Sequence, residues 1–107
     1  MKLELSIIER IVLMGILPKE GNFKTMRQLR VLREEIGFSD EETARIKLRE
    51  ENGLVRWDPK ETADKMVEMG LNMREALNGI LVKLDKEGKL LENMVTLYEK
   101  IVGVDPD

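Results

Sequence analysis

The side chains best suited to chemistry lie on both sides of one short turn, with Glu50 and Glu51 before it and Asp58 and Lys60 after it. Carboxylates and an amine of this kind could take part in acid–base chemistry or bind a hard metal ion. Their spacing matches no compact ligand motif, and acidic residues beside a turn are most often solvated. The sequence therefore predicts neither a catalytic site nor a metal site at this position.

Nucleophilic hydrolysis would need an activated hydroxyl or thiol beside a base. The chain has no Cys and no His, and its two serines, Ser6 and Ser39, are better explained as helix caps. Its glycines lack the spacing of a phosphate-binding loop. We therefore predict that the protein is not an enzyme and uses no cofactor.

The composition is that of one small domain, predicted to span residues 1–107. Hydrophobic residues make up 42% of the chain and charged residues 36%, and the net charge of -3 favours neither nucleic acid nor an anionic membrane. Glu4 and Glu9 are unlike a secretory signal, and the uncharged stretch Ile11–Pro18 is too short to span a bilayer. These features predict a cytoplasmic protein with no membrane partner.

The elements that must position these side chains are mostly helices, and the first is predicted from Ser6 to Leu17. Ser6 with Glu9 three residues later forms a capping box, and a proline follows the helix. Apolar residues surround almost the whole helix, with only Glu9 and Arg10 marking a solvated edge. This pattern predicts the buried central helix of the fold.

Two further helices are predicted in the N-terminal half. One spans about Phe23–Ile36 and ends at Gly37, a residue that helix C-termini favour. A shorter helix begins after Ser39, where Glu42 completes a second capping box, and ends near residue 46 or 47.

The Asn52-Gly53 pair predicts a β-hairpin with a type I′ turn. In that register Arg49 faces Arg56, and Leu48 faces Trp57 across the strands. A lone two-stranded ribbon is marginally stable in water, so the hairpin should pack on helices with Trp57 as its anchor.

Helical signals resume after the hairpin. The Asp58-Pro59 pair favours a helix start, and the fourth helix is predicted to run to about Lys86 with a possible bend at Gly70 or Gly79. A final helix is predicted over about Lys89–Val102. The fold class is therefore mainly α (α+β by strict count), with about five helices, one central β-hairpin and a winged-helix-like element order in the N-terminal half.

The C-terminal helices carry more apolar residues than one small core needs. One broad stripe runs from Met66 to Leu84 and suits a core, and a second, narrower stripe lies beside it. Excess apolar surface usually indicates a partner or a second copy, so we expect a homo-oligomer, most often a two-fold dimer, and an unknown protein partner. The candidate interface residues are Val67, Leu71, Met73, Leu77, Val82, Leu91, Val95 and Tyr98.

The element order leaves open an alternative, a winged-helix-like nucleic-acid-associated regulator. Lys24, Arg27 and Arg30 on the second helix could contact anions, and the residues up to Phe38 include 7 Lys and Arg against 5 Asp and Glu. However, the third helix begins with the acidic run Asp40–Glu42, which phosphates would repel. A solvated helix face also explains the three basic residues, and no aromatic beside them offers a stacking platform.

Four short segments of the chain stand out together: "ILPKEGNF" from Ile16 to Phe23, the following "LREEIGFSDEE", and "KLDKEGKL" with "LYEKIV" near the C-terminus. These segments resemble small uncharacterised proteins of tailed bacteriophages and prophages. Together they cover about a third of the chain, and Leu91 stands where such relatives would have a polar cap. The resemblance brings no catalytic motif. It implies a phage or prophage accessory protein in the host cytoplasm, acting as an oligomeric interaction or assembly module.

Overall fold

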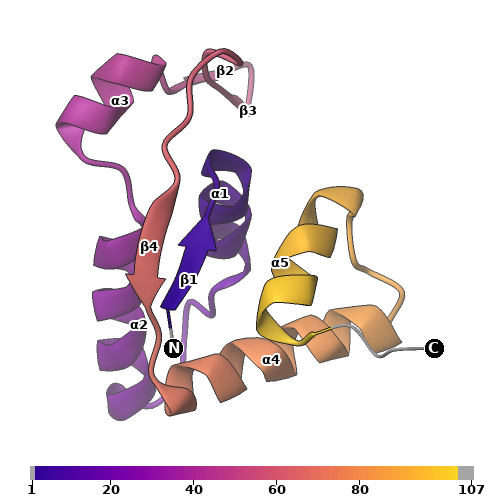
Figure 1. The fold of residues 1–107 in the computed structure, drawn as a ribbon. Coiled ribbons are helices and arrows are strands. Elements are labelled where there is room, and N and C mark those ends of the chain that lie inside the picture. The colour runs from indigo at the N-terminus through magenta and orange to yellow at the C-terminus, as the bar shows by residue number, and fades with distance from the viewer. Residues whose placement is uncertain (1, 104–107) are drawn as a thin grey trace.

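The computed structural model describes residues 2–103 and shows a mainly helical fold with two small antiparallel sheets (Figure 1). Within that range the elements number five α-helices, one 3-10 turn and four strands, which confirms the predicted fold class. In chain order the elements are β1 (Lys2–Leu5), α1 (Ile7–Ile16), α2 (Phe23–Ile36), α3 (Asp40–Ile46), β2 (Arg49–Glu51), β3 (Leu54–Arg56), β4 (Lys65–Glu68), α4 (Leu71–Lys86), η1 (Glu92–Met94) and α5 (Val95–Ile101).

The capping boxes place the starts of α1 and α3 correctly. The Ser6 hydroxyl accepts from the Glu9 backbone N–H, and the Glu9 carboxylate accepts in return from the Ser6 N–H at 2.9 Å. Ser39 and Glu42 form the same reciprocal pair at the start of α3. Since each box satisfies two backbone donors that the helix itself leaves free, the local sequence determines where these helices begin.

The hairpin has the predicted register. Asn52 and Gly53 have φ angles of 53° and 79°, as a type I′ turn requires, and Arg49 lies opposite Arg56. Trp57 is partly buried and packs with Leu48 in a small apolar cluster. The buried members of that cluster are Ile7, Ile46 and Ala63. The hairpin therefore packs on α1 and α3 through the residues that follow and precede its strands.

The prediction of a helix starting after Asp58 is wrong, because residues 59–64 form no helix and β4 follows them. Asp58 instead closes a turn, accepting from the Glu61 N–H through its backbone carbonyl at 3.0 Å. β4 pairs antiparallel with β1, which the sequence analysis did not predict, and Leu3 lies opposite Val67. The inward residues Leu3, Leu5 and Val67 are buried and Lys65 is partly buried, whereas the outward residues are exposed, an alternation typical of a strand.

The C-terminal part also differs from prediction in its boundaries. Gly70 is the N-cap of α4 rather than a bend, and the helix runs through Gly79 without interruption. The last helix begins at Val95 rather than near Lys89, after the short 3-10 turn η1. Leu91 precedes that turn without a side-chain cap, which accounts for the late start.

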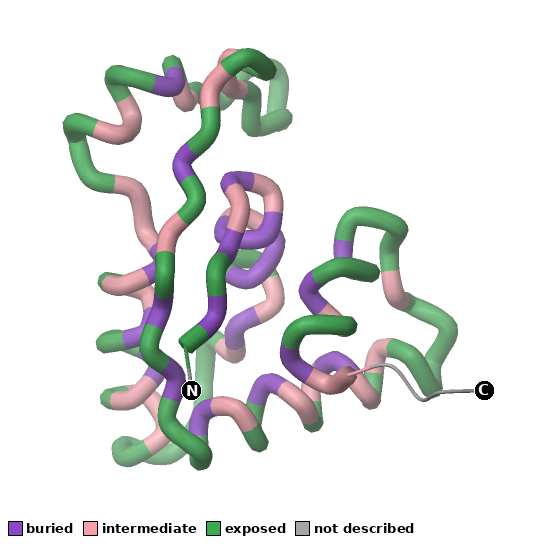
Figure 2. The backbone as a smooth tube through the Cα atoms, viewed as in Figure 1, coloured by how far each residue is buried: buried purple, intermediate pink, exposed green. Residues whose placement is uncertain are grey.

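The main core lies where the inner face of the β1–β4 sheet meets α1, α2, α4 and α5 (Figures 1 and 2). In Figure 1, β4 runs beside α2, α4 crosses the foot of the molecule, and α5 stacks on α4. The central position predicted for α1 is confirmed by the burial of Val12 and Leu13. This arrangement leaves the outer side of α2 and the start of α4 at the surface.

Candidate functional site

The most densely bonded polar group is the guanidinium of Arg10, which is fully buried. Its Nε donates to the Ile36 carbonyl at 2.9 Å, and Nη1 donates to the Ala63 carbonyl at 2.8 Å. Nη2 donates to the Gly37 carbonyl. Both terminal nitrogens also bind the Glu42 carboxylate, at 2.8 and 3.1 Å. All five N–H donors of the side chain are therefore engaged.

This burial corrects the prediction that Glu9 and Arg10 form a solvated edge of α1. Arg10 joins the end of α2, the start of α3 and the segment before β4, and its Cζ lies 4.0 Å from the centre of the Phe38 ring. The bidentate contact with Glu42 is the strong geometry for this ion pair. Arg10 therefore holds these three segments together, which is a structural role.

The pKa of Glu42 is lowered to about 2, first by the hydrogen bonds from Arg10. Partial burial acts in the opposite direction and raises this pKa, while the backbone N–H of Ser39 lowers it further. The carboxylate is therefore ionised throughout the ordinary pH range. Its oxygens accept hydrogen bonds from both the Ser39 N–H and the Arg10 guanidinium.

A second buried charge, Glu9, connects α1 to α5. Its Oε1 accepts from Lys100 Nζ at 2.6 Å, and the same ammonium donates to the Glu4 carbonyl at 2.7 Å. Burial raises the pKa of Glu9, but Lys100, the Ser6 N–H and the nearby Thr96 hydroxyl outweigh it, so the net pKa is lowered. Oε2 has no hydrogen-bond partner within residues 2–103. The Glu9–Lys100 pair therefore ties the C-terminal helix to the start of the chain.

An open groove of about 450 Å³ lies between α2 and the corner where β4 leads into α4. We call it the α2–α4 groove. Leu32, Met69 and Met73 are buried at its base, whereas Val31 and Leu71 on its two sides are 55% and 69% exposed. The complete lining is Arg27, Gln28, Val31, Leu32, Glu35, Glu68, Met69, Gly70, Leu71, Asn72 and Met73. The groove is apolar in its middle and polar at its margins.

The α2 side of the groove carries opposite charges at its two ends. Arg27, Val31 and Glu35 follow one another at four-residue spacing, so they lie on one helix face with about 12 Å between the first and last positions. Neither the Arg27 nor the Glu35 side chain forms an ion pair or hydrogen bond with any other described residue. Both charges remain available to a partner.

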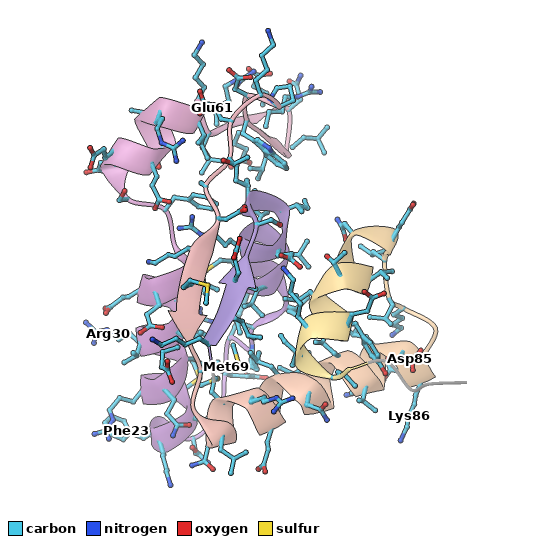
Figure 3. The ribbon with its side chains drawn as sticks, viewed as in Figure 1. Phe23, Arg30, Glu61, Met69, Asp85 and Lys86 are labelled. Carbon is cyan, nitrogen blue, oxygen red and sulfur yellow. The ribbon has the colours of Figure 1, made fainter. Side chains whose placement is uncertain are left out.

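The predicted anion-contact residues lie on α2, and all three are exposed. Arg30 projects from the outer side of the helix, as does Phe23, which is 80% exposed (Figure 3). Phe23 directly precedes Lys24, so the expectation that no aromatic lies beside the basic residues is wrong. Arg30 lies 3.8 Å from Glu34, and Arg27 lines the groove together with Glu35 and Glu68. The three residues do not form a continuous basic surface.

The predicted interface residues separate into three groups. Val67, Met73 and Leu77 are buried in the core of the chain itself, so they do not form an exposed interface stripe, although Met73 also lines the base of the α2–α4 groove. The prediction assumed one continuous helix, but Val67 belongs to β4. Met73 and Leu77 lie on the face of α4 that packs against the core. Leu71, Leu91 and Val95 are exposed, and Val82 and Tyr98 are partly buried.

We call Leu91, Val95 and Tyr98 the C-terminal stripe. Leu91 is 58% exposed and Val95 46% exposed. The Tyr98 hydroxyl lies 3.4 Å from the Asp85 carboxylate on α4. The C-terminal stripe and the α2–α4 groove thus belong to different elements and form two separate candidate surfaces.

The residues first considered for chemistry lie at the surface around the hairpin. The Glu51 carboxylate pairs with Arg49 at 2.7 Å, and Glu61 pairs with Arg45 at 3.1 Å. Asp58 caps its own turn by accepting from the Lys60 N–H. Within residues 2–103, no group of three or more acidic side chains is placed to hold a metal ion.

The groove was not predicted because a solvated helix face also explains its charged residues. The four-residue spacing of Arg27, Val31 and Glu35 was visible, but the opposite wall of the groove is built by β4 and α4. That wall depends on the β1–β4 pairing.

In the described part of the chain no helix is both long and apolar enough to cross a bilayer. No family model, curated protein or solved structure matches the chain.

Proposed function

We propose that the protein is a non-enzymatic, self-associating interaction module that serves as an accessory or assembly factor. The observation that carries this proposal is the exposure of aliphatic side chains on two separate surfaces, the α2–α4 groove and the C-terminal stripe. Exposed aliphatic side chains gathered on one surface are typical of sites that bind another protein. Two such surfaces allow one to bind a second copy while the other binds a different partner.

The energetic reason lies in residues such as Leu71 and Leu91, each more than half exposed. Full burial of a leucine side chain contributes about 1.5–3 kcal/mol, so several such residues covered together would favour association. In contrast, the two buried charges are already engaged within the chain, because Arg10 donates to backbone carbonyls and Glu9 accepts from Lys100. Their arrangement supports a structural role.

We further propose that this accessory role belongs to phage or prophage biology, which the resemblance carried by the segments around Ile16–Phe23 and residues 83–90 supports. An accessory factor in an infected or lysogenic cell is a role in which binding alone suffices. A small module with a self-association surface and a second apolar surface is suited to it.

Self-association is tested by measuring the molecular mass of the purified protein by sedimentation equilibrium over a wide range of concentrations. We expect the mass to rise from the monomer value of 12.4 kDa towards about twice that value. A mass that stays at the monomer value at every concentration would refute self-association.

The alternative, a nucleic-acid-associated regulator, draws its support from the exposure of Lys24, Arg27 and Arg30. We expect no salt-sensitive affinity for duplex DNA or RNA, because acidic side chains lie beside two of these residues. The measurement is fluorescence anisotropy with labelled duplexes at increasing salt. Binding that weakens steeply with salt and is lost on substitution of all three residues would replace our proposal with this alternative.

A further inference from the structure

We infer that two copies of the chain pair through the α2–α4 groove, with their α2 helices antiparallel about a two-fold axis near Val31. In this arrangement Arg27 of each copy meets Glu35 of the other. The inference rests on the self-association proposed above and names the surface that carries it.

The groups along one face of α2 follow an order that is complementary to its own reverse. Arg27, Val31 and Glu35 present a positive, an apolar and a negative group at equal spacing. A second helix in the reverse direction presents negative, apolar and positive groups at the same heights. Two-fold pairing therefore brings opposite charges together at both ends, whereas parallel pairing would bring like charges together.

Within residues 2–103, both of these charges are free to meet a second copy. The Arg27 and Glu35 side chains form no ion pair or hydrogen bond with another residue of the described range. By comparison, Arg30 on the same helix lies 3.8 Å from Glu34. Arg27 and Glu35 both border the groove.

An apolar surface lies between the two charges. Val31 lies at the centre of the α2 face, and Leu71 borders the groove from the start of α4. A second copy placed on the groove covers both side chains and excludes water from the charges at either end. Each copy contributes the same residues, which is the defining property of a two-fold interface.

The choice of a second copy over another occupant follows from the same pattern. A different protein would have to carry an acid, an aliphatic residue and a base at matching spacing, and this chain already does. Glu35 and Glu68 on the groove make a nucleic-acid backbone a poor occupant.

The test is a charge exchange across the proposed axis. Arg27→Glu and Glu35→Arg, made separately, replace two attractive contacts per dimer with two repulsive ones and should each raise the dimer Kd by about tenfold. The double variant R27E/E35R restores opposite charges at both ends and should return the Kd to near the wild-type value. Sedimentation equilibrium measures the Kd, and circular dichroism melting checks that each variant folds.

Arg30→Glu is the matched control, because it makes the same charge change on α2 outside the groove and should leave the dimer Kd unchanged. A double variant that associates no better than the single variants would overturn the antiparallel pairing. If groove variants keep the wild-type Kd while Leu91→Asp dissociates the oligomer, self-association stands but uses the C-terminal stripe. A wild-type protein that is monomeric throughout refutes the proposed function as well.

Discussion

Replacement of Arg10 by methionine should lower the free energy of unfolding by about 3–5 kcal/mol, the range for removing one member of a buried ion pair. Methionine fills similar space but leaves the Glu42 carboxylate without its cation. The carbonyls of Ile36, Gly37 and Ala63 lose the same donor. Lysine would be a poor substitute because a single ammonium cannot serve these separate acceptors together.

Urea denaturation followed by circular dichroism measures this loss. Arg30→Met is the matched control, because Arg30 is exposed and its contact with Glu34 spans 3.8 Å, so its removal should change the unfolding free energy by less than about 0.5 kcal/mol. Equal effects of the two substitutions would contradict the structural role assigned to Arg10.

The second large effect is a loss of stability in acid, about 2–3 kcal/mol from Glu42 alone. Its pKa is lowered from 4.5 to about 2 in the folded protein, and each unit of difference corresponds to about 1.36 kcal/mol before a discount for partial exposure. Between these pH values the unfolded chain binds the proton and the folded chain does not. This contribution is therefore fully present above pH 4.5 and is lost as the pH falls towards 2.

Glu9 acts in the same direction, because its pKa is also lowered in the folded state. The measurement is the free energy of unfolding in urea at a series of pH values from neutral to acid. Glu42→Gln should be less stable at neutral pH and should show a flatter pH profile, while Asp40→Asn on the same helix serves as the control. A Glu42→Gln profile parallel to that of the wild type would rule out Glu42 as the source.

Local signals predicted the N-terminal half well because they act over a few residues. The reciprocal bonds of Ser6 with Glu9 and of Ser39 with Glu42 require only three-residue spacing and the start of a helix. The Asn52-Gly53 turn likewise determines the register of its own strands. In each case the interaction that selects the structure lies within the segment itself.

The sheet and the groove could not be predicted in the same way. Lys2–Leu5 alternates polar and apolar residues, a strand signal, but its partner Lys65–Glu68 lies in a region where Asp58-Pro59 favoured a helix. The burial of Arg10 depends on acceptors from three distant segments. The sequence shows where each of these residues lies along the chain, but it does not show which of them come into contact in the fold.

The pairing of β1 with β4 has a consequence for how the chain folds. Each contact in this sheet joins residues about 60 positions apart, so closing that loop costs entropy before any pairing repays it. During synthesis on the ribosome, β1 emerges well before β4, and until then Leu3 and Leu5 lack their cover. A nascent chain halted in that interval would expose an unpaired strand edge and would be the species most prone to aggregation.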